Sequence, residues 1–247
     1  MADRIFLAGA TGVVGRRLIP LLREAGHEVW GTTRRAEKGD ELAKAGAHPV
    51  IVDVFDADAL SAAVLSARPH VVIHQLTDLP PKLDPAGMEA ALPRNARIRD
   101  EGTRNLIAAA LAAGARRLIA QSIAWTYAPG PEPHGEDDPL KAAAEGPSGV
   151  TMRGVISLEE QVLNAAPMEG IVLRYGELYG PRTGSDAPQG TSPLHVDAAA
   201  HAALLAIDHG RPGAYNIAEP NAAIATGKAA AELGWRPDFR LPAAAGD

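Results

Sequence analysis

The sequence predicts an α/β protein built on a doubly wound, Rossmann-type parallel sheet. Short apolar runs such as 5–8 and 71–74 are typical of strands that are buried on both faces. Segments with helical periodicity separate these runs over most of the 247 residues, as expected when helices connect parallel strands. A glycine-rich turn at 9–15 joins the first strand to the first helix, which is where proteins of this class bind phosphate groups.

The first helix is expected at 14–25. Val14, Leu18, Leu22 and Ala25 fall on one helical face, and a glycine follows at position 26 that can end the helix. Pro20 lies inside this segment, where it removes a backbone hydrogen bond and is expected to kink the axis.

The remaining elements follow from the same two periods. Apolar and β-branched runs predict strands, and apolar residues at helical spacing predict the helices between them. The further strands are expected at 29–33, 49–52, 71–74, 117–121, 171–174 and 214–217. The further helices are expected at about 38–45, 57–65, 97–113, 152–163, 198–208 and 225–233. Stretches rich in Gly, Pro and polar residues predict loops at 128–150 and 180–193.

The composition excludes several classes of protein. With 46% hydrophobic and 22% charged residues, the chain is expected to form a globular core. It has no cysteine, which excludes disulfides and cysteine-ligated metals, and its histidines lack a zinc-binding spacing, so no metal site is expected. A net charge of −6 without a long basic run argues against nucleic acid as a partner. Without a membrane-spanning run or a signal peptide, we expect a cytoplasmic protein that acts on a small molecule, and a homodimer is one assembly it could form.

The three glycines of the turn have different expected roles. Gly9 lets the chain leave the strand, Gly12 lets the backbone approach a pyrophosphate, and Gly15 lets the helix pack closely on the sheet. The free N–H groups at the start of the helix then face the phosphates. The predicted cofactor contacts from this turn are Gly9, Thr11, Gly12, Val13, Val14 and Gly15. The alternative is a glycine-rich turn with a purely structural role.

The G-x-x-G-x-x-G spacing of this turn resembles the short-chain dehydrogenase/reductase superfamily, in particular its extended, NAD-dependent epimerase/dehydratase-like branch. Further segments resemble that branch in the same order along the chain, at 52–54, 74–77, 102–106, 173–181, 195–197 and 233–237. The resemblance implies that Asp53 and Val54 contact the adenine and that Gln75 and Leu76 border the dinucleotide. It also implies a cofactor contact at Gln121, at the end of the fifth strand.

The end of the second strand predicts which dinucleotide is bound. An NAD site places an acidic residue there to bind the ribose hydroxyls, whereas this chain has Thr33 followed by Arg34 and Arg35. A guanidinium can bind a 2′-phosphate through paired hydrogen bonds, so NADP(H) is favoured over NAD(H), with Arg34 the better candidate. The alternative is that both arginines are a solvated surface pair.

The Tyr-x-x-x-Lys pair that members of this superfamily commonly use for proton transfer is missing. None of the four tyrosines has a lysine four residues later, and the expected positions hold Met152 and Ile156. The candidate catalytic residues are therefore Tyr127 first, because it follows the fifth strand, and then Tyr175 and Ser122. We expect Glu159 and Glu160, later in the same helix, to form a solvated face.

These observations predict a single NAD(P)-binding domain over residues 1–247. Its abbreviated substrate-side segments are expected at about 175–195 and 217–247. The predicted function is NADP(H)-dependent oxidoreduction or epimerisation of a small carbonyl or hydroxyl compound with non-standard catalytic residues. The alternative is a non-catalytic dinucleotide-binding sensor or regulatory protein of the same fold.

Overall fold

The computed structural model describes residues 2–80, 83–142 and 145–242. Its centre is a seven-stranded sheet in which each pair of neighbouring strands is parallel, in the order β3-β2-β1-β4-β5-β6-β9. The strands of this sheet are β1 (Arg4–Ala8), β2 (Glu28–Thr33), β3 (His48–Ile51), β4 (Val71–His74), β5 (Arg117–Ile123), β6 (Glu169–Tyr175) and β9 (Gly213–Ile217). Two short parallel strands, β7 (Glu177–Tyr179) and β8 (Pro193–His195), pair outside it. The doubly wound fold class is confirmed.

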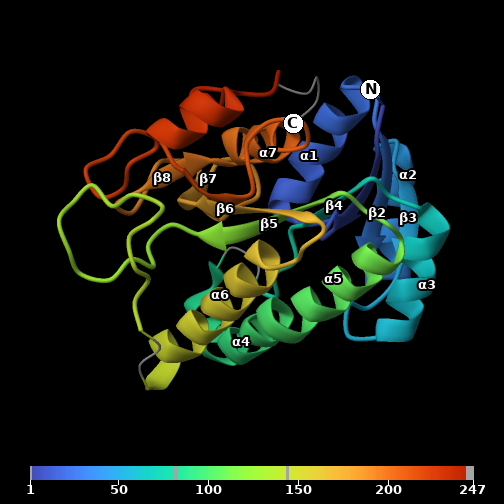
Figure 1. Ribbon diagram of the computed structural model, residues 1–247, viewed down its shortest axis with the longest axis horizontal. Coiled ribbons are helices and arrows are strands. Elements are labelled where there is room, and N and C mark those ends of the chain that lie inside the picture. The colour runs from blue at the N-terminus through green and yellow to red at the C-terminus, as the bar shows by residue number, and fades with distance from the viewer. Residues whose placement is uncertain (1, 81–82, 143–144, 243–247) are drawn as a thin grey trace.

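Helices cover both faces of the sheet (Figure 1). One face carries α1 (Val13–Glu24), α2 (Gly39–Lys44) and α7 (Val196–Leu205). The other face carries α3 (Ala57–Ala67), α5 (Thr103–Ala112) and α6 (Gly146–Leu163), and α4 (Pro85–Arg97) packs against α6. Two separate apolar clusters result, one on each face, with β-branched and leucine side chains of the strands alternating between them.

The strand order reverses between β1 and β4. The chain winds from β1 outward to β3, returns to β4 on the other side of β1, and winds outward again to β9. At such a switch point the connections leave the sheet in opposite directions, which opens a crevice at the carboxyl ends of the two central strands.

Two helices differ from the prediction. The helix predicted at 97–113 is one part of a longer run that begins with α4, continues through a π-helical turn at Ile98–Gly102 and ends with α5. The periodicity of α4 was missed because Pro93 interrupts it; Asp84 caps its start by accepting a hydrogen bond from the Ala86 amide at 3.1 Å. In α1, by contrast, the helix continues through Pro20, which is exposed.

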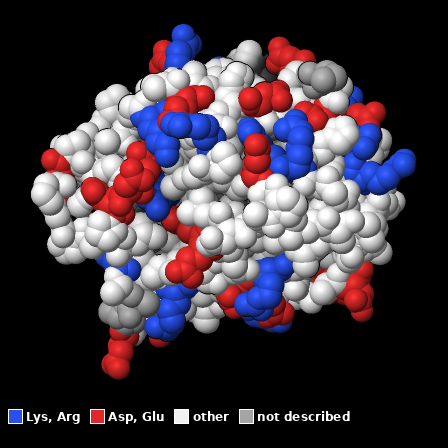
Figure 2. Space-filling model, in the orientation of Figure 1, with Lys and Arg blue, Asp and Glu red and all other residues white. Residues whose placement is uncertain are grey.

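The two predicted loops also end earlier in the structure than the sequence predicts. The loop expected at 128–150 ends where α6 begins at Gly146, and the stretch expected at 180–193 lies between β7 and β8. The last helix expected, at 225–233, is a π-helical turn at Ala229–Leu233. Basic and acidic side chains are interspersed over the face of the molecule that Figure 2 shows. In the described part of the chain, no helix combines the length and the apolar character that a membrane crossing requires.

Candidate cofactor groove and active site

A groove lies at the switch point, at the carboxyl ends of β1, β2 and β4; we call it the switch-point groove. Seven of the residues predicted to bind the cofactor line it: Gly9, Thr11, Gly12, Arg34, Val54, Gln75 and Leu76. The remaining lining residues are mostly apolar or small: Ala8, Thr32, Thr33, Val52, Phe55, Leu60, Thr77 and Ile98. Five segments far apart in sequence therefore meet around one groove.

The glycine turn has no room for side chains. Gly9 has a φ of +89°, and a Cβ atom there would lie 2.5 Å from the carbonyl oxygen of Gln75. A Cβ at Gly15 would lie 2.4 Å from the Gly9 oxygen, and one at Gly12 would lie 3.2 Å from the same atom. The approaches at Gly9 and Gly15 explain why these two positions need glycine, since a Cβ within 3 Å of a backbone oxygen forces the backbone apart.

The start of α1 is left open toward this groove. Gly12 is the N-cap residue, and no side chain accepts a hydrogen bond from the first turn of the helix. The orphan amides of residues 13–15 therefore need an outside acceptor, which is the condition for anion binding at a helix N-terminus. Val13, Val14 and Gly15 are not among the residues that line the groove, so any contact from them would come through their backbone amides.

The two arginines after β2 are placed differently. Arg34 lines the groove, its side chain is half exposed, and its Nη2 atom lies 3.6 Å from an Asp78 oxygen. Asp78 is shared, because it also accepts a hydrogen bond from Arg94 at 3.0 Å. Arg35 is exposed and does not line the groove. Arg34 is therefore the arginine that can reach a group bound there.

Other predicted contacts shape the groove from its rim. The Asp53 carboxylate accepts a hydrogen bond from the Phe55 amide at 3.0 Å and so forms the turn after β3. Gln121 lies 3.5 Å from the Leu76 carbonyl oxygen, to which its amide donates. The Gln75 amide donates to the Tyr175 hydroxyl at 3.3 Å, and its Oε1 atom is buried without a hydrogen-bond partner among the described residues. An orphaned acceptor beside the groove is suited to a donor on a bound molecule.

Beyond the groove, β5, β6, β9 and α6 bring together a buried polar network. Ser122 donates to Glu159 Oε1 at 2.6 Å, and Arg174 pairs with Glu159 Oε2 at 2.8 Å. Arg174 also donates to the Tyr127 hydroxyl at 2.8 Å, and that hydroxyl donates to Asn216 at 2.6 Å. Two of the three candidate catalytic residues, Tyr127 and Ser122, therefore belong to one hydrogen-bonded chain.

The expectation that Glu159 and Glu160 form a solvated face was wrong for Glu159. Its side chain is buried, with only 3% of the residue exposed, whereas Glu160 is exposed. Burial of a carboxylate requires compensation, and here it comes from Arg174 on β6 and Ser122 on β5. Helical periodicity could have indicated that Glu159 faces inward, because Met152, Val155 and Leu158 mark the buried side of α6.

The hydroxyls of the tyrosines are held in place by their surroundings. Burial raises the pKa of Tyr127, and the adjacent Arg174 and Asn216 offset part of this rise. Tyr175 is completely buried, which raises the pKa of its phenol strongly, and its hydroxyl donates to the Ala199 carbonyl at 3.1 Å. Tyr175 lines neither the switch-point groove nor the pocket described next, and its side chain packs in the apolar cluster on the α1 and α7 face of the sheet.

A second cavity of about 390 Å³ lies next to this network; we call it the Trp125 pocket. The Trp125 side chain is 43% exposed, and the rings of Tyr127 and His134 stack at a centroid distance of 5.1 Å. Trp125, Tyr127 and His134 line this pocket, and its other lining residues are Ala124, Ala128, Pro129, Gly130, Glu132, Lys141, Thr191, Ser192, Ala223 and Ile224. The last four of these belong to the two predicted substrate-side segments, while residues 243–247 of the second segment lie outside the described part of the chain.

Comparison with known proteins identifies the family. A family model described as the NAD dependent epimerase/dehydratase family matches residues 5–194. The chain belongs to this family. The 3-diazoavenalumate denitrifying reductase of a Streptomyces species is 40% identical to it, over 98% of this chain and 85% of that protein. The family and this relative are enzymes, which favours catalysis over the sensor interpretation.

Solved structures of epimerase/dehydratase relatives share the fold. UDP-glucose 4-epimerase of Thermotoga maritima, solved with UDP-glucose, has a TM-score of 0.77 at 18% identity, covering 96% of this chain and 94% of that one. The Thermus thermophilus UDP-glucose 4-epimerase in complex with NAD has a TM-score of 0.75 at 19% identity, covering 96% and 95%. The Bordetella bronchiseptica enzyme WbmG in complex with NAD has a TM-score of 0.72 at 21% identity, covering 98% and 91%.

No group of three or more His, Asp or Glu side chains that could hold a metal ion is found among the described residues. The buried polar side chains beyond the groove are instead paired with one another, as Glu159 is with Arg174. Candidate roles at this site therefore rest on hydroxyl, carboxylate and guanidinium groups.

Proposed function

We propose that this protein is an NADP(H)-dependent reductase that transfers a hydride to a small aromatic diazo substrate and releases dinitrogen. The observation that carries the proposal is the pairing of the two hydroxyls at the active site. Ser122 donates its proton to Glu159, and Tyr127 donates its proton to Asn216. Neither hydroxyl is free to donate to a substrate, so a reduction that needs no proton fits this site best.

The reaction balances without a proton donor. An aryl diazonium ion plus one hydride gives the arene and dinitrogen; a C–H bond forms, and the electron pair of the C–N bond leaves with the nitrogen. The missing Tyr-x-x-x-Lys pair is then no handicap, since that pair serves proton transfer. The name of the Streptomyces relative, a denitrifying reductase of a diazo compound, supports this substrate class.

Bound in the switch-point groove, a reduced nicotinamide dinucleotide would supply the hydride. Gly9, Gly12 and the open start of α1 fit its diphosphate, because they leave room and unpaired amides there. Arg34 is the side chain that would bind a 2′-phosphate, which supports NADP(H). The Trp125 ring and the stacked rings of Tyr127 and His134, which line the Trp125 pocket, fit an aromatic ring.

The experiment uses NADPH deuterated at the transferable position and benzenediazonium as the probe. We expect deuterium in the arene product and release of dinitrogen at a rate well above that of the protein-free mixture, with NADPH used in preference to NADH. Product analysis by mass spectrometry measures the transfer. If no deuterium reaches the arene with either nucleotide, the proposal is wrong.

A second candidate function is reduction or epimerisation of a carbonyl or hydroxyl compound, with Tyr127 moving the proton. It is favoured by one observation, the hydrogen bond from Arg174 to the Tyr127 hydroxyl, which stabilises a phenolate. The Tyr127→Phe variant separates the two functions. We expect it to leave diazonium reduction within about threefold of wild type, whereas loss of a proton donor would slow carbonyl turnover by about 10²–10⁴-fold.

A further inference from the structure

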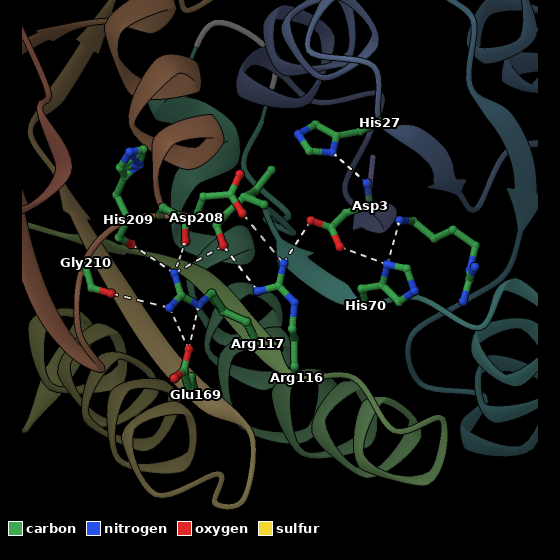
Figure 3. Close-up of polar contacts among 12 residues, drawn as sticks. Asp3, His27, His70, Arg116, Arg117, Glu169, Asp208, His209 and Gly210 are labelled. Atoms are coloured by element: carbon green, nitrogen blue, oxygen red, sulfur yellow. Dashed lines mark hydrogen bonds and ion pairs between the residues drawn. The ribbon is translucent and has the colours of Figure 1, made fainter. Parts of the chain in front are cut away.

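Three arginines are buried in the described part of the chain, and two of them are fully paired. Arg117 binds Glu169 and several carbonyl oxygens at the end of α7, as Figure 3 shows. Arg174 binds Glu159, Tyr127 and the Glu136 carbonyl oxygen. Arg99 is the exception: it is only 8% exposed, no hydrogen bond or ion pair joins it to a described residue, and its nitrogens are not among the fully buried atoms that lack a partner, so the guanidinium keeps some accessible surface.

The surroundings of Arg99 leave its positive charge uncompensated. Burial lowers the pKa of Arg99 to about 10, so the guanidinium still carries its charge at neutral pH. Glu159 is the acidic residue that attracts it, but both Glu159 oxygens already bind Ser122 or Arg174. His74 adds no negative charge and stays neutral, since burial and the nearby Arg99 lower its pKa to about 4. One carboxylate therefore serves two buried guanidinium groups.

The position of Arg99 links the groove to the candidate active site. It lies in the π-helical turn at Ile98–Gly102, whose first residue lines the switch-point groove. Its charge acts on His74, the residue before Gln75 in the groove wall, and on Glu159, which binds Ser122. The turn that carries Arg99 packs against α6, where the Asp100 carboxylate accepts a hydrogen bond from Ser157 at 2.6 Å, so Arg99 lies beside the helix that supplies Glu159.

We infer that Arg99 is a specificity-determining residue that binds a carboxylate of the substrate. An isolated buried charge is costly, and an anionic ligand that pairs with it regains that cost on binding. A guanidinium offers two parallel N–H groups that match the two oxygens of a carboxylate. This inference rests on the proposed function, because it assigns the anionic part of the substrate that the same site reduces.

The test measures binding first, so that it does not depend on turnover. Cinnamate and its neutral amide, cinnamide, are titrated into wild type and the Arg99→Met variant in the presence of NADP⁺, by calorimetry. We expect cinnamate to bind wild type about 10–100-fold more tightly than the variant, and cinnamide to bind both equally. Arg99→Lys keeps the charge without the paired N–H groups and should lie between them.

Stability and cofactor affinity complete the test. Arg99→Met should unfold at the same temperature as wild type or higher, because it removes an unpaired buried charge, and its NADPH affinity should stay within about twofold of wild type. Equal cinnamate affinity in wild type and variant, no cinnamate binding by wild type, a lower unfolding temperature, or a loss of NADPH affinity above tenfold would each overturn the inference.

A turnover arm distinguishes this inference from the proposed function. Benzenediazonium bearing a 4-carboxylate is compared with the 4-carboxamide in both proteins. We expect Arg99→Met to raise KM for the carboxylate alone, with kcat nearly unchanged. If neither diazonium is reduced while cinnamate binding still depends on Arg99, the proposed function fails and the carboxylate site stands.

Discussion

The amino ends and the carboxyl ends of the strands in the central sheet carry the same kinds of residues. They differ in how far the charged and polar groups are paired. At the amino ends of the strands, Asp3 accepts hydrogen bonds from His70 and Arg116, and Arg117 binds Glu169 and the carbonyls that end α7 (Figure 3). At the carboxyl ends, an orphaned Gln75 oxygen and open helix amides lie at the groove, and Arg99, in the turn whose first residue lines the groove, has no hydrogen-bond or ion-pair partner among the described residues.

The difference teaches how to separate scaffold from site in this molecule. A polar group that the protein itself satisfies holds elements together, and Arg117 does so between β5, β6 and α7. A buried polar group that the protein leaves unsatisfied is costly, and a site for a ligand is the usual reason for such a cost. The variants below test this distinction, from the largest expected effect to the smallest.

The largest effect is expected from Arg174→Met. It leaves Glu159 buried without its cation, which costs about 3–5 kcal/mol of unfolding free energy. Arg117→Met, at the amino ends of the strands, should lower the unfolding free energy by less, about 1–3 kcal/mol, because its partner Glu169 is half exposed and can be hydrated. Urea unfolding measures both. Equal losses of unfolding free energy in the two variants would contradict the idea that the Arg174–Glu159 pair is more deeply buried than the Arg117–Glu169 pair.

The second prediction concerns pH and two histidines at opposite ends of β4: His70, which precedes the strand, and His74, which is its last residue. His74 has a pKa lowered to about 4 in the folded protein, below the ordinary value of 6.5, so the unfolded chain binds its proton more tightly. The stability that the neutral ring contributes is therefore fully present above pH 6.5 and is lost as the pH falls toward 4. The total is about 3 kcal/mol.

The His74→Gln variant removes that dependence. Its unfolding free energy, measured from pH 7 to pH 4, should fall by about 3 kcal/mol less than that of wild type. His70→Gln, at the amino end of the same strand, is the matched control and should keep the wild-type loss that is due to His74. An unchanged slope in His74→Gln would show that another group is responsible.

A third comparison uses Gly9, at the carboxyl ends of the strands, and Gly26, at the amino ends. Gly9→Ala would place a methyl group 2.5 Å from the Gln75 oxygen, so we expect a loss of about 1–3 kcal/mol in stability and at least tenfold weaker NADPH binding. Gly26→Ala, near the amino end of β2, has a φ of +84° but nothing within 4 Å of the added carbon. It should cost about 1 kcal/mol and leave NADPH binding unchanged. Fluorescence titration with NADPH distinguishes the two.

The smallest effect separates the neighbouring arginines after β2. Arg34→Ala should weaken NADPH binding by about 10–100-fold and NADH binding by less than threefold, because only NADPH carries the 2′-phosphate. Arg35→Ala is the control, since Arg35 does not line the groove, and it should change neither affinity. Equal weakening of both nucleotides in Arg34→Ala would refute the predicted preference.

Much of the fold was predictable because strands and helices have different periods. The runs 5–8, 71–74 and 171–174 fall within β1, β4 and β6. The helix α4 was not predictable in the same way, since Pro93 disrupts its pattern and tertiary packing against α6 compensates for the lost backbone bond. The short pair of β7 and β8 was missed as well, because three-residue strands carry no period.

The candidate site likewise has one part that could be predicted from the sequence and one part that could not. The glycine turn was predictable, because a strand, three spaced glycines and the start of a helix follow one another directly along the chain and their steric roles are local. Glu159 was misjudged, since an acidic residue on a helix is usually solvated, and its partner Arg174 lies on another element.

By itself, the sequence determined the alternation of strands and helices, the phosphate turn and the absence of a Tyr-x-x-x-Lys pair, because each depends on residues a few positions apart. Only the tertiary structure decided which charges are paired. Ser122, Glu159 and Arg174 meet because β5, α6 and β6 pack together, and Arg99 has no acceptor because Glu159, the carboxylate that attracts it, already binds Ser122 and Arg174. Periodicity indicates which face of an element is buried, but the partner across the core depends on how the elements pack.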